Sequence, residues 1–324
     1  MPFTEIPTEQ VQNIGEIQLI RLIKKWLGSV NPPAPNGMGD DCAITEAGQT
    51  RQIITTDTLS YGQHFDSTVS ARDAGSKLIK RNLSDIAAMG GHPQHAVLAL
   101  LCGADTSIDW LESFFKGIRE SAQHYDLKIV GGDVSALETR QFSAVVTLVG
   151  LIEQTKLRTG ASIGDAIYVT GSLGGSILGK HYHFKPRLGE GQWLVQQSDC
   201  TALMDLTDGL AKDLTHLLPE SSAAAIALNQ VPVSNDARLL AEQTGCDPFE
   251  HVFCDGEDYE LLFTASKDCD LSAFERAWAQ TFPQLQLSRI GTIIATDLPN
   301  TPLLDAVSNE AFPWSQGFQH LKNA

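Results

Sequence analysis

The chain has 324 residues, of which 42% are hydrophobic and 19% charged, and its formal net charge is −16. This composition is typical of a folded protein with about two domains, and the negative charge argues against nucleic acid or an anionic membrane as a partner. The six cysteines lack C-x-x-C spacing, and no apolar run is long enough to span a bilayer, so we expect no zinc site, no redox pair, no membrane segment and a cytoplasmic location.

The first half of the chain alternates predicted helices and strands. We predict helices over residues 16–27, 70–89 and 110–125, and strands over 52–59, 95–102, 127–130 and 141–152. Ser70 and Asp73 form a predicted capping pair for the second helix. Residues 31–39 hold three prolines and two glycines, which predicts a loop that carries Asp40 and Asp41.

The second half begins a new alternation near residue 151. We predict strands over residues 166–170, 259–265 and 287–295, a glycine-rich turn over 171–179 that enters a helix, and a helix over 209–218. The fold class is therefore α/β (α+β), with one domain over residues 1–150 and a second over 151–324.

Aspartates recur at the ends of these elements, beside glycines or apolar residues and with few basic neighbours. They are Asp40, Asp41, Asp57, Asp85, Asp133, Asp205 and Asp208. Two carboxylates 4 Å apart repel by roughly 4 kcal/mol at an effective dielectric of 20, so a cluster of them requires bound cations. An all-oxygen ligand set favours Mg²⁺ or Mn²⁺ over zinc. Because Mg²⁺ completes its coordination with water and substrate phosphates, the pattern indicates a polyphosphate substrate.

Each of these motifs also has a simpler structural interpretation. Asp40 and Asp208 are of a type that favours turns and helix caps. Asp85 can pair with Arg81 one helical turn away. Gly131 and Gly132, like the turn at 171–179, can serve a tight connection, since glycine-rich turns are weak signals for phosphate.

Taken together and in order, the segments resemble the thiamine-monophosphate kinase family, which shares a superfamily with aminoimidazole ribonucleotide synthetase. The motifs that carry the resemblance are residues 37–43, 56–59, 64–65, 82–90, 131–133 and 255–261. The resemblance implies a homodimer of two-domain chains, each domain a mixed sheet covered by helices. It also implies ATP near the dimer interface, several magnesium ions between the phosphates, and thiamine monophosphate as the acceptor.

The resemblance also implies roles for individual residues. Metal-binding positions are Asp41, Asp57, Asp85, Asp133, Asp205 and Asp208, with Thr55 and Thr56 adding oxygen ligands. Nucleotide-binding positions are Gly132, Asp133, Arg158 and Thr207; His64, Glu257 and Phe318 hold thiamine monophosphate, although Phe318 can equally pack a C-terminal tail onto the core. Two positions depart from the family pattern: Thr207 replaces a frequent serine, and Asp255 a frequent glycine.

No catalytic side chain is predicted for the transfer itself. A phosphate monoester has a second pKa of about 6, so the acceptor is largely dianionic at neutral pH and needs no general base. No Ser-His-Asp or Cys-His arrangement is apparent in the sequence, and we predict direct in-line transfer assisted by magnesium. Three alternatives stay open: an aminoimidazole ribonucleotide synthetase, a magnesium-dependent phosphohydrolase, and a non-catalytic binder of metal or nucleotide.

Overall fold

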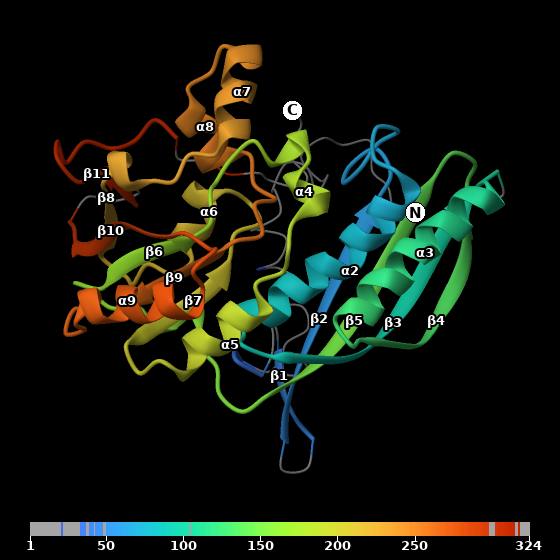
Figure 1. Cartoon of the computed structure of the whole chain (residues 1–324), viewed down its shortest axis with the longest axis horizontal. Coiled ribbons are helices and arrows are strands. Elements are labelled where there is room, and N and C mark those ends of the chain that lie inside the picture. The colour runs from blue at the N-terminus through green and yellow to red at the C-terminus, as the bar shows by residue number, and fades with distance from the viewer. Residues whose placement is uncertain are drawn as a thin grey trace.

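Two mixed β-sheets, each with its own helices, build the protein (Figure 1). The computed structural model describes residues 21, 33–36, 39–41, 43–47, 50–103, 105–297, 302–314 and 317. The first sheet has the order β1 (Ala43–Ala47), β2 (Thr50–Ser60), β5 (Phe142–Ile152), β3 (His92–Gly103) and β4 (Lys128–Leu137). Only the β3–β4 pair is parallel. The predicted mixed sheet is confirmed for this half.

Helices α2 (Ala71–Ala88) and α3 (Ile108–His124) cover one face of the first sheet. Strict alternation of buried and half-buried residues along β5 marks that covered face. The two helices cross closely because glycines lie at the contact: a Cβ on Gly75 would lie 2.0 Å from the carbonyl oxygen of Phe114, and one on Gly117 1.9 Å from that of Arg72. This close crossing fixes α2 firmly over the strands.

Helix α2 agrees closely with its prediction. The Ser70 hydroxyl accepts a hydrogen bond from the backbone N–H of Asp73, as a capping pair requires. The helix predicted over residues 16–27 lies outside the described residues except for Arg21.

Strand β4 differs from its prediction. It continues through the glycines at 131 and 132 to Leu137, pairing with β3 along its length. A Cβ on Gly132 would lie 1.9 Å from the carbonyl oxygen of Leu98 in β3. The glycine therefore permits close approach of two strands, and the tight turn considered for this pair is wrong.

The second sheet has helices on both faces. Its order is β11 (Leu303–Asp305), β8 (Ser222–Ile226), β10 (Leu287–Ala295), β6 (Ala166–Thr170), β9 (Leu261–Ala265) and β7 (Cys200–Asp205). Aromatic residues of α9 (Leu271–Thr281) and apolar residues of α5 (Leu188–Gln196) pack on one face. Apolar residues of α6 (Leu210–Thr215) and α8 (Pro248–Cys254) pack on the other. The β11–β8 pair is parallel and the other pairs are antiparallel, so this sheet is also mixed.

The remaining elements of this half are short. They are η4 (Arg158–Gly160), η5 (Ser176–Leu178), α4 (Lys180–His183), η6 (Leu228–Gln230) and α7 (Asn235–Thr244). The strands predicted over 166–170 and 287–295 are confirmed with those bounds, and the turn at 171–179 leads into η5 and α4. The helix predicted over 209–218 is confirmed but shorter, because α6 ends at Thr215.

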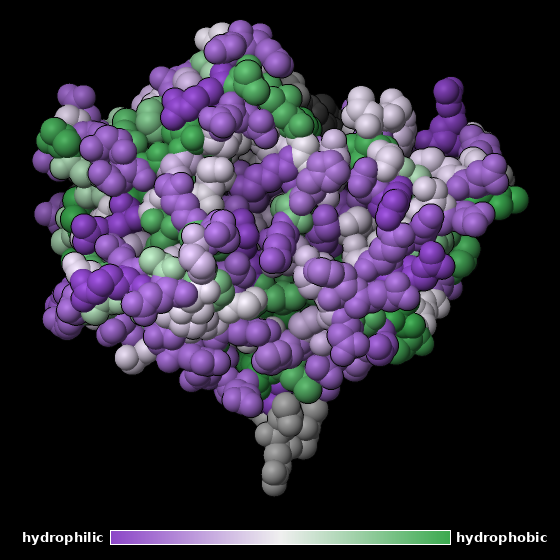
Figure 2. Space-filling model, in the orientation of Figure 1, coloured by the Kyte–Doolittle hydropathy of each residue, from purple (hydrophilic) through white to green (hydrophobic). Residues whose placement is uncertain are grey.

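Helix α2 also contacts the second half of the molecule, through α4, α5 and β7. Gly191 of α5 allows this, since a Cβ there would lie 1.9 Å from the carbonyl oxygen of Ala87. Hydrophilic side chains predominate on the face shown in Figure 2, and hydrophobic ones form small groups. In the part of the chain that the structure describes, no helix has the length and apolar character needed to span a bilayer.

Candidate active site

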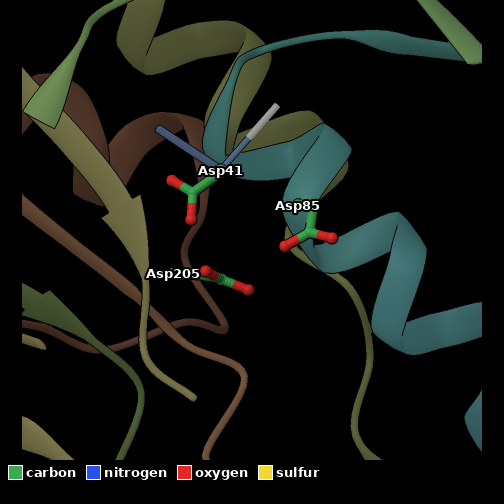
Figure 3. A group of neighbouring side chains, drawn as sticks. All are labelled: Asp41, Asp85 and Asp205. Atoms are coloured by element: carbon green, nitrogen blue, oxygen red, sulfur yellow. The ribbon is translucent and has the colours of Figure 1, made fainter. Parts of the chain in front are cut away.

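Three carboxylates from distant parts of the sequence meet between the two sheets. Asp41 precedes β1, Asp85 lies in the last turn of α2, and Asp205 is the final residue of β7. One oxygen of each lies within 4.8 Å of the others, and Figure 3 shows the three side chains around a common space. The convergence expected from the sequence is therefore present for these three residues.

The surroundings of this cluster make its negative charge costly. Burial, together with repulsion from Asp57 and Asp205, raises the pKa of Asp85 well above its ordinary value. Burial also raises the pKa of Asp205. The Thr55 hydroxyl donates to Asp85, and the Ser84 hydroxyl donates to Asp205 at 2.6 Å. These neutral donors do not cancel the charge, so an oxygen-only site of this kind suits a hard divalent cation.

Arg158 is the basic residue directly beside the cluster. Its guanidinium forms an ion pair with Asp41, with Nε 3.3 Å from Oδ2, and its backbone N–H donates to Asp40 at 3.2 Å. The arginine predicted to contact the nucleotide therefore lies directly beside the carboxylate cluster.

Asp57 and Asp208 flank the cluster and line one cavity of about 630 Å³ together with Asp85. Arg81 Nη2 lies 3.5 Å from Asp57, so the ion pair considered for Arg81 forms with Asp57. Lys212 Nζ lies 2.6 Å from Asp208. Three further predicted site residues line the same cavity: His64, Thr207 and Glu257.

Thr56, a predicted oxygen ligand, lies on the opposite face of strand β2 from Thr55. Successive side chains of a strand point to opposite faces, so Thr56 points away from the face that carries Thr55 and Asp57; its hydroxyl donates to the Val146 carbonyl at 3.1 Å. The roles predicted for Thr56 remain predictions.

Gly132 and Asp133 lie on β4 at the edge of the first sheet. The strand register connects Asp57 to Gly132 through Val146 and Leu98, three spacings of about 4.8 Å or roughly 14 Å in all. Asp133 accepts a hydrogen bond from Ser135 at 2.8 Å. Within one chain these two residues are thus apart from the carboxylate cluster. Phe318 lies outside the described residues.

Sequence reasoning missed the residues that support this site. Asp213 is buried, and its carboxylate accepts the backbone N–H groups of Thr207 at 2.8 Å and Asp208 at 2.9 Å. It therefore holds the loop that presents Asp208. Its place five residues after Asp208, on the first turn of α6, is the signal that the sequence offered.

The side of the cavity where the acceptor is predicted to bind contains Glu257. Burial alone would raise the pKa of Glu257, but hydrogen bonding to His181 and the charges of Lys77 and Arg81 outweigh it and lower that pKa to about 2. Glu257 is thus ionised at neutral pH beside His64, with Lys77 as its ion-pair partner at 2.9 Å.

The fold and these converging carboxylates define a class of ATP-using enzymes. Residues 39–152 match the family model described as "AIR synthase related protein, N-terminal domain". A solved structure, "AaThiL complexed with AMPPCP and TMP", superposes with a TM-score of 0.81 at 28% identity, covering 97% of this chain and 99% of that one.

The names of two similar proteins identify the family within this class. The thiamine-monophosphate kinase of Rhodopirellula baltica is 35% identical over 89% of this chain and 92% of its own. That of Aquifex aeolicus is 33% identical over 80% of this chain and 88% of its own. The chain therefore belongs to the thiamine-monophosphate kinase family.

Proposed function

We propose that this protein transfers the γ-phosphoryl group of ATP to thiamine monophosphate, giving thiamine diphosphate and ADP. The observation that carries the proposal is the meeting of Asp41, Asp85 and Asp205 beside a cavity that also contains His64 and Glu257. The family relationship and the ligands named for the AaThiL structure support the same reaction.

Several magnesium ions are part of this proposal. Asp41, Asp85 and Asp205 would hold them, with Asp57 and Asp208 at the flanks. The fit rests on the repulsion that remains between Asp85 and Asp205, which are withdrawn from solvent, after Arg158 has paired with Asp41. Magnesium, when bound, would neutralise charge on the phosphates that meet there.

The chain's own residues bind and orient the two substrates. Arg158 offers a planar guanidinium to a phosphate from the Asp41 side. Glu257 faces the acceptor with its fixed negative charge, which suits the cationic thiazolium ring better than the phosphate. With the ring held at Glu257, the phosphate of the acceptor points toward the carboxylate cluster. That phosphate is already ionised, so no side chain has to remove a proton from it.

The test is incubation of the purified protein with ATP, magnesium and thiamine monophosphate, followed by chromatography. We expect thiamine diphosphate and ADP in equal amounts. Free phosphate without thiamine diphosphate would indicate a hydrolase, and ATP binding without turnover would indicate a binder. Turnover of the aminoimidazole ribonucleotide synthetase substrate in place of thiamine monophosphate would indicate that enzyme.

A stereochemical experiment tests direct transfer. With a chirally labelled γ-phosphorus we expect inversion of configuration, and retention would indicate a phospho-enzyme intermediate.

The active form in this proposal is a homodimer. Strand β4 is a sheet edge with exposed apolar side chains, Val130 at 62% and Val134 at 74%, and Val97 of β3 is 43% exposed beside it. A second copy covering this edge would also bring Gly132 and Asp133 into an interface. We expect light scattering to give twice the chain mass and Val134→Asp to give a monomer. A monomeric wild-type protein would contradict this.

We also propose a domain division, the absence of a nucleic-acid partner and a cellular compartment. The domain division at residues 150 and 151 lies close to the change of sheet between Ile152 and Ala166. The net charge of −16 supports the absence of a nucleic-acid partner. The cytoplasm is the compartment that we expect.

A further inference from the structure

Lys77 is a fully buried cation in the middle of α2. Its side chain is 0% exposed, and a buried ammonium is costly unless each of its three N–H donors finds an acceptor. Nζ lies 2.7 Å from the carbonyl oxygen of His64, 2.7 Å from Nδ1 of His181 and 2.9 Å from Oε2 of Glu257. The ammonium thus donates to His64 and Glu257 and has His181 as its third polar neighbour.

All three partners of Lys77 border the acceptor side of the site. His64, His181 and Glu257 line a cavity of about 200 Å³. His64 and Glu257 also line the larger cavity that contains Asp57 and Asp85. Lys77 lines neither cavity among the residues described around them, so any effect on a ligand passes through its partners.

The three partners come from segments far apart in the sequence. His64 follows β2 in the first half of the chain, whereas His181 lies in α4 and Glu257 follows α8 in the second half. A single ammonium therefore bonds to both halves of the chain beside this cavity.

Glu257 needs this support because of its backbone. Its φ of 56° and that of Tyr259, 51°, are in the left-handed region, which non-glycine residues adopt at a cost. The Tyr259 hydroxyl donates to Oε1 at 3.1 Å, and the Glu257 N–H donates to the Thr207 carbonyl at 2.7 Å. Lys77 supplies the charged contact of this set.

We propose that Lys77 is a positioning residue for thiamine monophosphate, which it serves by fixing His64 and Glu257 at the separation that the acceptor requires. This inference rests on the proposed function. It implies that loss of Lys77 weakens acceptor binding and leaves ATP binding unchanged, because the contacts of Lys77 are with none of Asp41, Asp85, Asp205 or Arg158.

The test compares Lys77→Met with Lys80→Met. Methionine keeps the length of the side chain and removes its charge. We expect Lys77→Met to raise the KM for thiamine monophosphate at least about tenfold, with the KM for ATP within about twofold of wild type. Lys80 is a matched control on the same helix: its ammonium donates at 2.8 Å to the carbonyl of Tyr182, which is not among the lining residues of either cavity. Lys80→Met should leave both KM values unchanged.

A second variant separates positioning from folding. Lys77→Met takes from the partly buried carboxylate of Glu257 its ion-pair partner at 2.9 Å, which lowers stability. Lys77→Met/Glu257→Gln removes both charges, so its melting temperature should return toward that of wild type. Because Lys77 acts in part through Glu257, the double variant should raise the KM for thiamine monophosphate by less than the product of the two single effects.

The outcomes are distinct. Equal increases in both KM values, no increase in either, or independent effects of the two substitutions in the double variant would each overturn the role of Lys77. A wild-type protein that makes no thiamine diphosphate would instead overturn the proposed function, before any variant is compared.

Discussion

Asp85→Asn is expected to lower kcat by roughly 10³-fold while the protein remains folded. Asp85 supplies one of three carboxylates within 4.8 Å of one another, and an asparagine oxygen is a much weaker ligand for Mg²⁺. The measurement is kcat at saturating ATP and thiamine monophosphate. Asp126→Asn is the control, because Asp126 is an exposed surface residue and its φ of 50° suits asparagine. Near-normal kcat for Asp85→Asn would exclude Asp85 from the metal site.

The same substitution should stabilise the protein when no metal is bound, although it lowers kcat. In EDTA we expect Asp85→Asn to melt at a higher temperature than wild type, because one repelling charge is gone, and to gain less from added Mg²⁺. Burial and neighbouring carboxylates raise the pKa of Asp85. A raised pKa in the folded state means that stability is lost as the pH rises through it. The metal-free wild type should therefore lose more stability than Asp85→Asn as the pH increases.

Glu260→Ala is expected to lower the free energy of unfolding by about 3–5 kcal/mol. Glu260 is 1% exposed, and its carboxylate accepts two hydrogen bonds from Arg187, each at 2.7 Å, and one from Thr170 at 2.7 Å. Lys180 Nζ lies 3.0 Å away. Alanine would remove the nearest anion of two partly buried cations, whose other carboxylate partners are more distant: Asp258 lies 3.6 Å from Lys180, and Glu190 lies 3.9 Å from Arg187. Chemical denaturation measures the effect.

The control for Glu260 is a surface ion pair. Glu120 lies 2.6 Å from Arg72, with both side chains substantially exposed. Exposed pairs contribute about 0–1 kcal/mol, so Glu120→Ala should have a small effect. A loss below about 1 kcal/mol for Glu260→Ala would mean that Arg187 and Lys180 find other partners.

Much of the fold could be predicted where the signal is local. The cap at Ser70 and the helical spacing that follows it predicted α2, and β-branched runs predicted β6 and β10. The full length of β4 could not be predicted from its own residues. The strand continues through the glycines at 131 and 132 because it pairs there with β3, which lies in another part of the sequence. Short elements such as α4 and η5 depend on tertiary contacts and gave no clear pattern.

The site residues, too, could be predicted only where the sequence carries a signal of its own. The recurrence of aspartates at the ends of elements and the family resemblance predicted a converging set of carboxylates, which includes Asp41, Asp85 and Asp205. The two-residue period of a strand separates Thr56 from Thr55, and it was available from the sequence. In contrast, nothing in the sequence marks Lys77 as buried, because that depends on acceptors contributed by three other segments.

Helix α2 bonds to carboxylates of the second half of the molecule at two places. Lys77 reaches Glu257 near the middle of the helix, and Ser84 reaches Asp205 near its end. Each bond joins a residue of one half to a residue that the other half must supply. The two halves therefore cannot evolve as interchangeable modules: a chimaera that combined this first half with a distant second half would have to inherit both matching carboxylates to assemble a working enzyme.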